Sequence, residues 1–183
     1  IRFAHKTFAV DHALKNLQTD YVLWLDADTY TFRPISTEFV TGLLPSDKLV
    51  NFLGRGDKYP ECGWVCYNRN HKKRIEFMEY WTNLYIQDTI FKELEWHDSY
   101  VFWQCVKRIA PNDGVDIGKG AGAKGHHVFV NSVLGSYVDH LKGKRKIKGK
   151  SSASDLRMAR DEDYWKNVES YDPFSGLKFD PKK

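Results

Sequence analysis

The strongest hydrophobic pattern in the chain is the uninterrupted apolar run of residues 21–25, which leads directly into Asp26-Ala27-Asp28. A continuous run of this length predicts a strand that is buried on both faces, as in the interior of a parallel sheet. Aspartate is a poor strand former and is costly to bury without a partner. Two carboxylates at the end of such a strand therefore indicate a ligand site at the carboxyl edge of a sheet.

The rest of the chain alternates between helical and strand patterns. Apolar residues at helical spacing predict helices over residues 3–17, 37–44, 71–86 and 100–109. Short β-prone or apolar runs predict strands over residues 29–32, 49–53, 63–67 and 127–131. Residues 114–125 are rich in glycine but lack the spacing of a phosphate-binding loop, which predicts a mobile loop. Ser152 and Asp155 form a capping box that predicts a late helix reaching residue 168. Alternation of this kind indicates an α/β domain.

Composition indicates one ordered domain with a substantial core. The chain has 183 residues, of which 42% are hydrophobic and 15% aromatic. Its three cysteines, Cys62, Cys66 and Cys105, are odd in number and lack the spacing of a zinc finger. We therefore expect reduced thiols and a cytoplasmic location.

The positive charge of the chain is concentrated in one segment. Residues 142–150 carry six basic side chains and no acid, within a chain whose formal net charge is +4. Such a segment favours partners that bear phosphate: a nucleotide, an anionic membrane surface or nucleic acid. A basic loop that is simply solvated explains the composition equally well.

The spacing of Asp26 and Asp28 suits a metal ion. With one residue between them, both carboxylates can approach a single divalent cation through oxygen ligands. The simpler alternative is a strand that ends in a polar turn, with one aspartate as a cap.

A second motif, far along the chain, suits the same chemistry. His140, Gly143 and Lys146 have the spacing His-x-x-Gly-x-x-Lys. Imidazole can supply a third ligand to a cation such as Mn²⁺. The glycine allows close approach of a phosphate to the backbone, and the lysine offers a positive charge to a diphosphate leaving group. Taken alone, a histidine before a basic loop is more often a surface residue.

Together, the two motifs resemble those of the GT-A glycosyltransferases, most closely family 8, which includes glycogenin and bacterial lipo-oligosaccharide galactosyltransferases. The resemblance implies a GT-A, Rossmann-like domain with a mixed central sheet. It also implies that Asp26, Asp28 and His140 hold Mn²⁺ or Mg²⁺, and that the ion holds the diphosphate of a nucleotide sugar. Gly143 and Lys146 would contact that diphosphate.

Three further segments extend the resemblance. Residues 61–68 are similar to the Asn-Ala-Gly segment of the family, which implies that Glu61 and Cys62 contact the donor sugar. Residues 96–99 resemble the Asp-Gln segment of family 8 and equally the Trp-His-Asp-Glu segment of the blood-group transferases. By either alignment Asp98 faces the sugar or the acceptor, and Ser99 stands where relatives carry Gln or Glu. The first helix is similar to the helix that precedes Asp-x-Asp in the family, in which a basic residue contacts the nucleotide-sugar donor. The resemblance implies this role for Arg2 and Lys6.

The resemblance covers residues 1–151, and residues 152–183 are expected to form a C-terminal helix and a peripheral tail. The first strands of the family, which bind the nucleotide base, have no counterpart here, so we expect a domain that is truncated at its N-terminus. Because Glu61 and Ser99 depart from the family pattern, retention and inversion at the sugar both stay open. Asp98 or Glu61 is the expected catalytic carboxylate.

The expected activity is metal-dependent transfer of a sugar from a UDP- or GDP-linked donor to an acceptor hydroxyl. The acceptor would be a carbohydrate, a lipid-linked glycan or a protein. We expect no nucleic-acid partner, whereas peripheral association with a membrane fits the basic segment.

Two other function classes remain. Haloacid-dehalogenase-type phosphatases also place Asp-x-Asp after a buried strand, with the first aspartate as nucleophile. Here bulky Tyr30 follows Thr29, and no later acidic pair stands out as a Mg²⁺ site. The second alternative is a non-catalytic module that binds anions or nucleic acid through residues 142–150, but that segment lacks the interleaved aromatics that would stack on bases.

Overall fold

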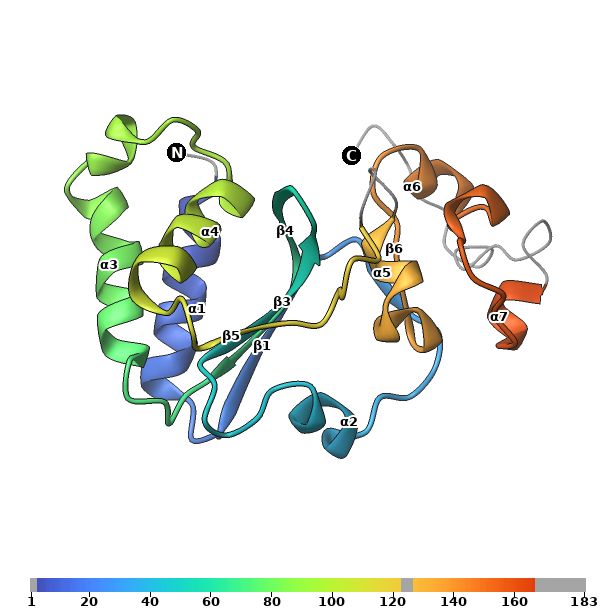
Figure 1. The fold of residues 1–183 in the computed structure, drawn as a ribbon, viewed down its shortest axis with the longest axis horizontal. Coiled ribbons are helices and arrows are strands. Elements are labelled where there is room, and N and C mark those ends of the chain that lie inside the picture. Colours follow the sequence, from blue (N-terminus) through green and yellow to red (C-terminus); the bar gives the residue numbers. More distant parts are fainter. Residues whose placement is uncertain (1–2, 123–126, 167–183) are drawn as a thin grey trace, which may run out of the picture.

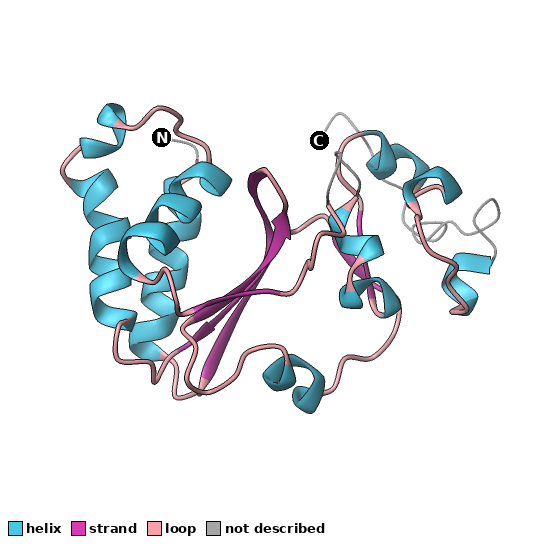
Figure 2. Ribbon diagram, in the orientation of Figure 1, coloured by secondary structure: helices cyan, strands magenta, loops and turns pink. Residues whose placement is uncertain are grey.

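The computed structural model describes residues 3–122 and 127–166, which form a mixed α/β domain. The α-helices are α1 (Ala4–Asn16), α2 (Thr37–Gly42), α3 (Arg74–Ile86), α4 (Asp98–Ile109), α5 (Val128–Asn131), α6 (Lys144–Lys148) and α7 (Asp163–Lys166). The strands are β1 (Tyr21–Leu25), β2 (Thr29–Thr31), β3 (Val50–Arg55), β4 (Lys58–Asn68), β5 (Gly114–Asp116) and β6 (Val138–His140). Short 3-10 turns are η1 (Thr89–Lys92), η3 (Val133–Ser136) and η4 (Ala153–Asp155). Figures 1 and 2 show these elements in one orientation.

Four strands form the central sheet, in the order β1-β4-β3-β5. The β1–β4 and β3–β4 pairs are antiparallel and the β3–β5 pair is parallel, so the sheet is mixed, as expected. The prediction that β1 lies inside a parallel sheet is wrong. Among the described residues β1 is an edge strand, and of its five residues only Val22 is buried. An apolar run cannot by itself distinguish a central strand from an edge strand whose large side chains are half covered.

Three helices cover one face of this sheet. In Figure 1, α1, α3 and α4 stand together on the left of the strands. Their apolar stripes and the near face of the sheet form the larger hydrophobic cluster. The ring of Phe102 on α4 lies within 5.9–6.3 Å, centroid to centroid, of the rings of Phe52, Phe77 and Trp81. The apolar faces of α3 and α4 therefore pack against each other and against the sheet through aromatic rings, as amphipathic helices do.

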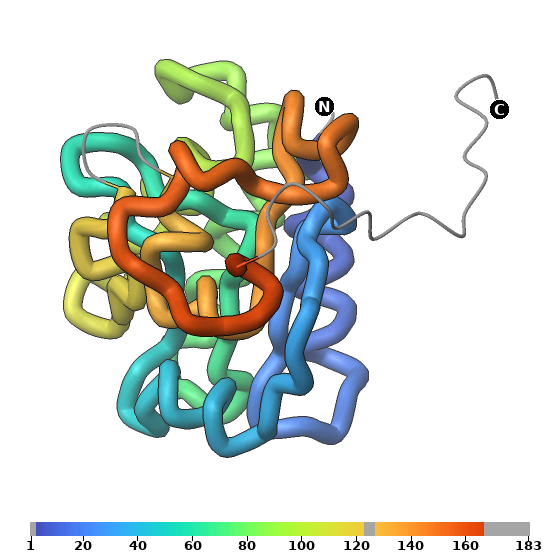
Figure 3. The backbone as a smooth tube through the Cα atoms, turned by 90° about the vertical axis from the view of Figure 1, so that its right-hand side faces the viewer, coloured from blue at the N-terminus to red at the C-terminus, as the bar shows by residue number. Residues whose placement is uncertain are grey.

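The other face carries a two-stranded sheet, β2 with β6, and a second hydrophobic cluster. Trp64 of β4, Phe129 of α5 and Trp165 of α7 belong to this cluster. Figure 3 looks onto this side and shows the C-terminal part of the described chain crossing in front of it. Tyr164 stacks on Phe32 at 3.9 Å between ring centroids, and the Trp165 indole donates to the Gly135 carbonyl at 2.7 Å.

Three predicted elements differ from the structure. Residues 127–131 were expected to form a strand, but Val128–Asn131 is the short helix α5, because the short apolar run Val128-Phe129-Val130 fits either state. The late helix is also wrong as a single element. The capping box of Ser152 and Asp155 is present, but it opens only the turn η4, a second short helix follows at Asp163–Lys166, and residues 167 and 168 lie outside the described residues.

The glycine-rich segment is the third difference. Gly114–Asp116, expected to belong to a mobile loop, forms β5 and pairs with β3, while residues 123–125 of the expected loop lie outside the described part of the chain. In the part of the chain that the structure describes, no helix has both the length and the apolar character needed to cross a bilayer.

Candidate functional site

The acidic couplet lies where β1 leaves the central sheet. The Asp26 amide donates to the Gly63 carbonyl at 2.9 Å, which continues the pairing of β1 with β4 by one residue. The indole of Trp24 donates to Oδ1 of Asp26 at 2.7 Å. This hydrogen bond fixes the orientation of the Asp26 carboxylate.

The β2–β6 sheet brings His140 to the couplet. Thr29 pairs with His140, and the Leu141 amide donates to the Asp28 carbonyl at 2.7 Å. As a result Nε2 of His140 lies 3.0 Å from Oδ1 of Asp28, across 112 residues of sequence. The imidazole is buried, and its ring centroid lies 4.5 Å from that of Phe129.

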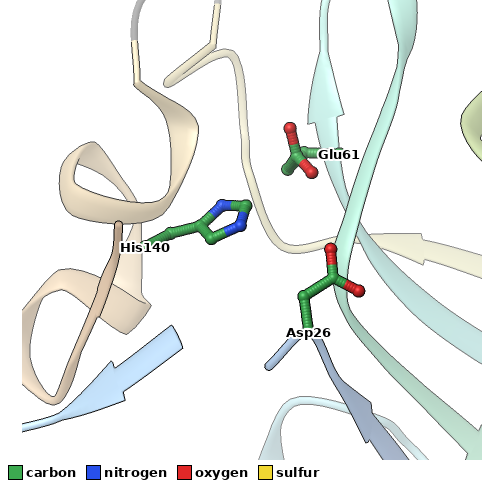
Figure 4. A group of neighbouring side chains, drawn as sticks. All are labelled: Asp26, Glu61 and His140. Atoms are coloured by element: carbon green, nitrogen blue, oxygen red, sulfur yellow. The ribbon is translucent and has the colours of Figure 1, made fainter. Parts of the chain in front are cut away.

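Glu61 on β4 completes a group of possible metal ligands. One ligand atom from each of Asp26, Glu61 and His140 lies within 4.8 Å of the other two (Figure 4). The side chains come from β4, from the end of β1 and from the end of β6, and they converge on one space. Glu61 was expected to contact a sugar, but its carboxylate can equally serve as a metal ligand. Asp28 is not a member of this group, but its Oδ1 lies 3.0 Å from Nε2 of His140, which is.

Three lysines surround the carboxylates. Nζ of Lys146 lies 3.1 Å from Asp28, Nζ of Lys142 3.6 Å from Glu61, and Nζ of Lys6 3.6 Å from Asp26. Burial raises the pKa of Asp28, but the hydrogen bond from Lys146 and the charge of His140 outweigh burial, so the pKa is lowered overall. The group is therefore an anionic centre whose charge is balanced by ammonium groups.

Lys6 joins the couplet to Asp98. It is buried, its ammonium donates to the Cys62 carbonyl at 2.5 Å and to the Asp98 carboxylate at 3.2 Å, and it lies 5.1 Å from the centre of the Trp24 ring. The sequence predicted that Lys6 contacts the nucleotide-sugar donor. It did not predict the ion pairs of Lys6 with Asp26 and Asp98. Arg2, expected to act alongside it, lies outside the described residues.

Asp98 is the first residue of α4, and the residue before it, His97, caps the helix by accepting from the Tyr100 amide. Two other predicted contact residues, Ser99 and Cys62, lie nearby. Ser99 is half-buried, and burial raises the pKa of the Cys62 thiol to about 12, with the nearby Lys6 charge acting in the opposite direction. Cys62 is therefore a neutral thiol, and its carbonyl is what reaches Lys6.

Gly143 and Lys146 lie at the start and in the middle of the short helix α6. Gly143 has φ +64°, and space beside it is open. Its carbonyl accepts from the Lys146 amide at 3.1 Å. A residue with a side chain would be strained at this φ, which gives the glycine of the motif a local reason.

Two supporting residues escaped the sequence reasoning. The fully buried Asp139 accepts from the His140 amide, from the amide and hydroxyl of Ser151, and from the hydroxyl of Tyr164, at 2.6–2.8 Å. A Cβ at Gly63 would meet Cε1 of His140 and the ring of Phe129, each at 3.1 Å. The position of Asp139 beside His140 was a usable signal, whereas nothing local in the sequence pointed to the close approach at Gly63.

Comparisons of this chain with protein-family models, with curated proteins and with solved structures found no significant match. The resemblance to family 8 therefore stays a prediction that rests on the residues of this chain.

The donor set suits a divalent cation. Carboxylate oxygens and one imidazole nitrogen are the ligands that Mn²⁺ accepts, and the oxygens alone suit Mg²⁺. Three carboxylates (Asp26, Asp28 and Glu61) and one imidazole exceed what a strand ending in a polar turn requires. The lysines lie where they can balance these charges or contact an anionic ligand.

Proposed function

We propose that this protein is a metal-dependent glycosyltransferase of the GT-A type that uses a nucleotide-sugar donor. The observation that carries the proposal is the convergence of His140 with the carboxylates of Asp26, Asp28 and Glu61 from distant parts of the chain. The mixed sheet that delivers Asp26 at the end of an edge strand is compatible with this fold. A cytoplasmic location remains our expectation.

Asp26, Asp28, Glu61 and His140 are the residues that would hold the cation. When bound, Mn²⁺ or Mg²⁺ would supply positive charge for the diphosphate of the donor. The indole of Trp24 and the ammonium of the buried Lys6 hold the half-buried Asp26 in place, so its carboxylate requires little reorganisation.

Lys146 is the proposed contact to the leaving diphosphate. Its side chain is exposed, and its ammonium lies beside Asp28, at the edge of the acidic group. A lysine at this position stabilises negative charge as it develops on the departing group. The open backbone at Gly143 allows a phosphate to come close.

Asp98 is the proposed contact to the sugar or acceptor hydroxyl, and Glu61 would take this role only if it does not hold the cation. In an inverting reaction that carboxylate accepts the proton of the hydroxyl. Lys6 pairs with both Asp98 and Asp26, and we propose that it acts as a positioning residue between them. A retaining reaction needs no such base.

Calorimetry with a set of UDP- and GDP-sugars, with and without Mn²⁺, tests the proposal. We expect at least one donor to bind only when Mn²⁺ is present. Asp28→Ala and His140→Ala should each weaken this binding by at least about 10- to 100-fold, the range typical when a side chain that orients a metal ligand is lost.

Asp57→Ala and His12→Ala are matched controls, because both side chains are exposed and lie outside the group. Metal-dependent binding that is equal in the site variants and the controls would contradict the proposal.

A phosphatase would instead hydrolyse a simple phosphoester with Mg²⁺, would lose activity in Asp26→Asn and would tolerate His140→Ala. Binding that depends strongly on salt and ignores every carboxylate would indicate an anion-binding module.

A further inference from the structure

The short helix α6 presents two chemically different faces. On a helix, residues 144, 145 and 148 fall on one side and residue 146 on the opposite side. Lys146 accordingly reaches Asp28 in the candidate metal group, whereas Arg145 turns away and pairs with Asp155. Lys144, Arg145 and Lys148 have no part in the proposed transfer reaction.

An open pocket lies against this second face. Its volume is about 480 Å³, and it is lined by Lys142, Gly143, Lys144, Arg145, Lys148, Lys150, Ser152 and Asp155. Five of these residues are cationic and one is anionic, and that one, Asp155, is already paired with Arg145. Within residues 3–122 and 127–166, neither Lys144 nor Lys148 has an ion-pair partner. Because Lys144 and Lys148 add positive charge that no described acid balances, the pocket favours an anionic ligand.

The helix that carries two of the pocket lysines also carries an exposed aliphatic side chain. Ile147, between the lysines of α6, is 91% exposed. An isolated exposed isoleucine needs no explanation by itself. On a basic helical turn next to an anion pocket, however, it adds an apolar group that can enter the headgroup region of a bilayer.

We propose that this pocket binds the phosphate of an anionic lipid headgroup, with α6 lying on the membrane surface and Ile147 directed into it. The inference goes beyond the proposed transferase and does not depend on it. Lysines close to an anionic surface each contribute to attraction, and one buried aliphatic side chain adds a smaller contribution. Nucleic acid is disfavoured because no aromatic side chain lines the pocket to stack on a base.

The position of the pocket also bears on the candidate site. Lys142 lines the pocket and lies 3.6 Å from Glu61, so the pocket and the metal group are neighbours. A protein held by this pocket would keep its candidate site close to the membrane surface.

Co-sedimentation of the full chain with phosphatidylcholine vesicles, with and without phosphatidic acid, tests the proposal. We expect binding only to the anionic vesicles. Lys144→Ala/Lys148→Ala should weaken it about 30-fold, from about fivefold per lysine near an anionic surface. Ile147→Ser should weaken vesicle binding while leaving the binding of soluble glycerol phosphate, followed by NMR, unchanged.

Lys72→Ala/Lys107→Ala removes the same charge from exposed positions elsewhere, and Ile86→Ser removes another exposed isoleucine. Both control variants should sediment like the parent chain. Equal losses in the two double-lysine variants would overturn the proposal, since net charge alone would then explain binding. It would also be overturned by an Ile147→Ser variant that binds vesicles normally, which would indicate a site for a soluble phosphate. Absence of vesicle binding, or tighter binding to a single-stranded oligonucleotide than to vesicles, would overturn it too.

Discussion

The candidate site joins two regions that are stabilised in different ways. Asp26 and Glu61 belong to the central sheet, which is backed by α1, α3, α4 and a large apolar core. His140 belongs to the β2–β6 sheet, which has a smaller apolar cluster and depends in addition on the buried carboxylate of Asp139. An apolar core spreads its contribution over many contacts, whereas a buried polar centre depends on every partner being satisfied. The carboxylate side of the site should therefore be robust and the imidazole side sensitive to single polar changes.

The largest expected effect is loss of the apolar core behind the sheet. Phe102 is 1% exposed and packs against three other aromatic rings. Phe102→Ala should lower the free energy of unfolding by about 4 kcal/mol, measured by urea denaturation followed by circular dichroism. Phe91→Ala, at an exposed phenylalanine, should change it by less than about 0.5 kcal/mol. Similar values for the two variants would show that this core is not what stabilises the carboxylate side.

A smaller but more local effect is expected at the polar centre. Asp139→Ala leaves the His140 amide, the Ser151 amide and hydroxyl, and the Tyr164 hydroxyl without their acceptor. We expect the free energy of unfolding to fall by about 3 kcal/mol. We also expect weaker Mn²⁺ binding, because the backbone of His140 loses its support. Asp161→Ala, at an exposed aspartate, is the control. The comparison fails if Asp139→Ala weakens folding while Mn²⁺ affinity in the folded protein stays at the level of the control.

The contact between the two regions gives a third test. A methyl group at residue 63 would stand 3.1 Å from the imidazole of His140 and from the ring of Phe129. Gly63→Ala should therefore cost about 1–2 kcal/mol and shift the NMR resonances of His140. Gly42→Ala has nothing within 4 Å of its new methyl group and should be neutral or slightly stabilising. Unchanged His140 resonances in Gly63→Ala would mean that residue 63 and the imidazole of His140 are not in close contact.

The smallest expected effect concerns acid stability at the edge of the imidazole side. Burial raises the pKa of Asp155, but the hydrogen bonds from Arg145 and Ser152 outweigh it and hold the pKa at about 2, below the ordinary value of 3.8. Because the folded pKa is the lower one, the ion pair stabilises the fold above pH 3.8, and this contribution is lost as the pH falls toward 2. Asp155→Asn should lower the free energy of unfolding at neutral pH by at most about 1 kcal/mol, since the pair is partly solvated.

Urea denaturation at neutral and acidic pH measures this difference. In Asp155→Asn the decline between pH 3.8 and about 2 should be shallower than in the parent chain. Asp161→Asn, at an exposed aspartate, should reproduce the decline of the parent chain. A decline in Asp155→Asn as steep as in that control would show that this ion pair does not contribute.

Periodicity predicted the elements of the helical side well. Residues 71–86 and 100–109 matched α3 and α4 because long apolar stripes have one interpretation. The imidazole side was harder to predict, since its elements are three to five residues long and take their conformation from tertiary contacts. For that reason Val128–Asn131 was mistaken for a strand.

The candidate site divides in the same way. Local spacing pointed to Asp26 with Asp28, and to His140 with Lys146, but only the resemblance to a family suggested that the two motifs meet. Which side chains then support the site depended on long-range packing. Burial of Lys6 between Asp26 and Asp98, and the four donors around Asp139, arise from segments that no local pattern connects.

The pairing of β2 with β6 has a consequence for timing. During synthesis Asp28 leaves the ribosome long before His140, which lies 112 residues further on. Closing a loop of that length is entropically costly and slow, so these strands join after the helical layer has formed its local contacts. A cation that needs the imidazole can be captured only after His140 has been synthesised and β6 has paired with β2. Its uptake would therefore report that this long-range pairing has formed rather than guide the first steps of folding.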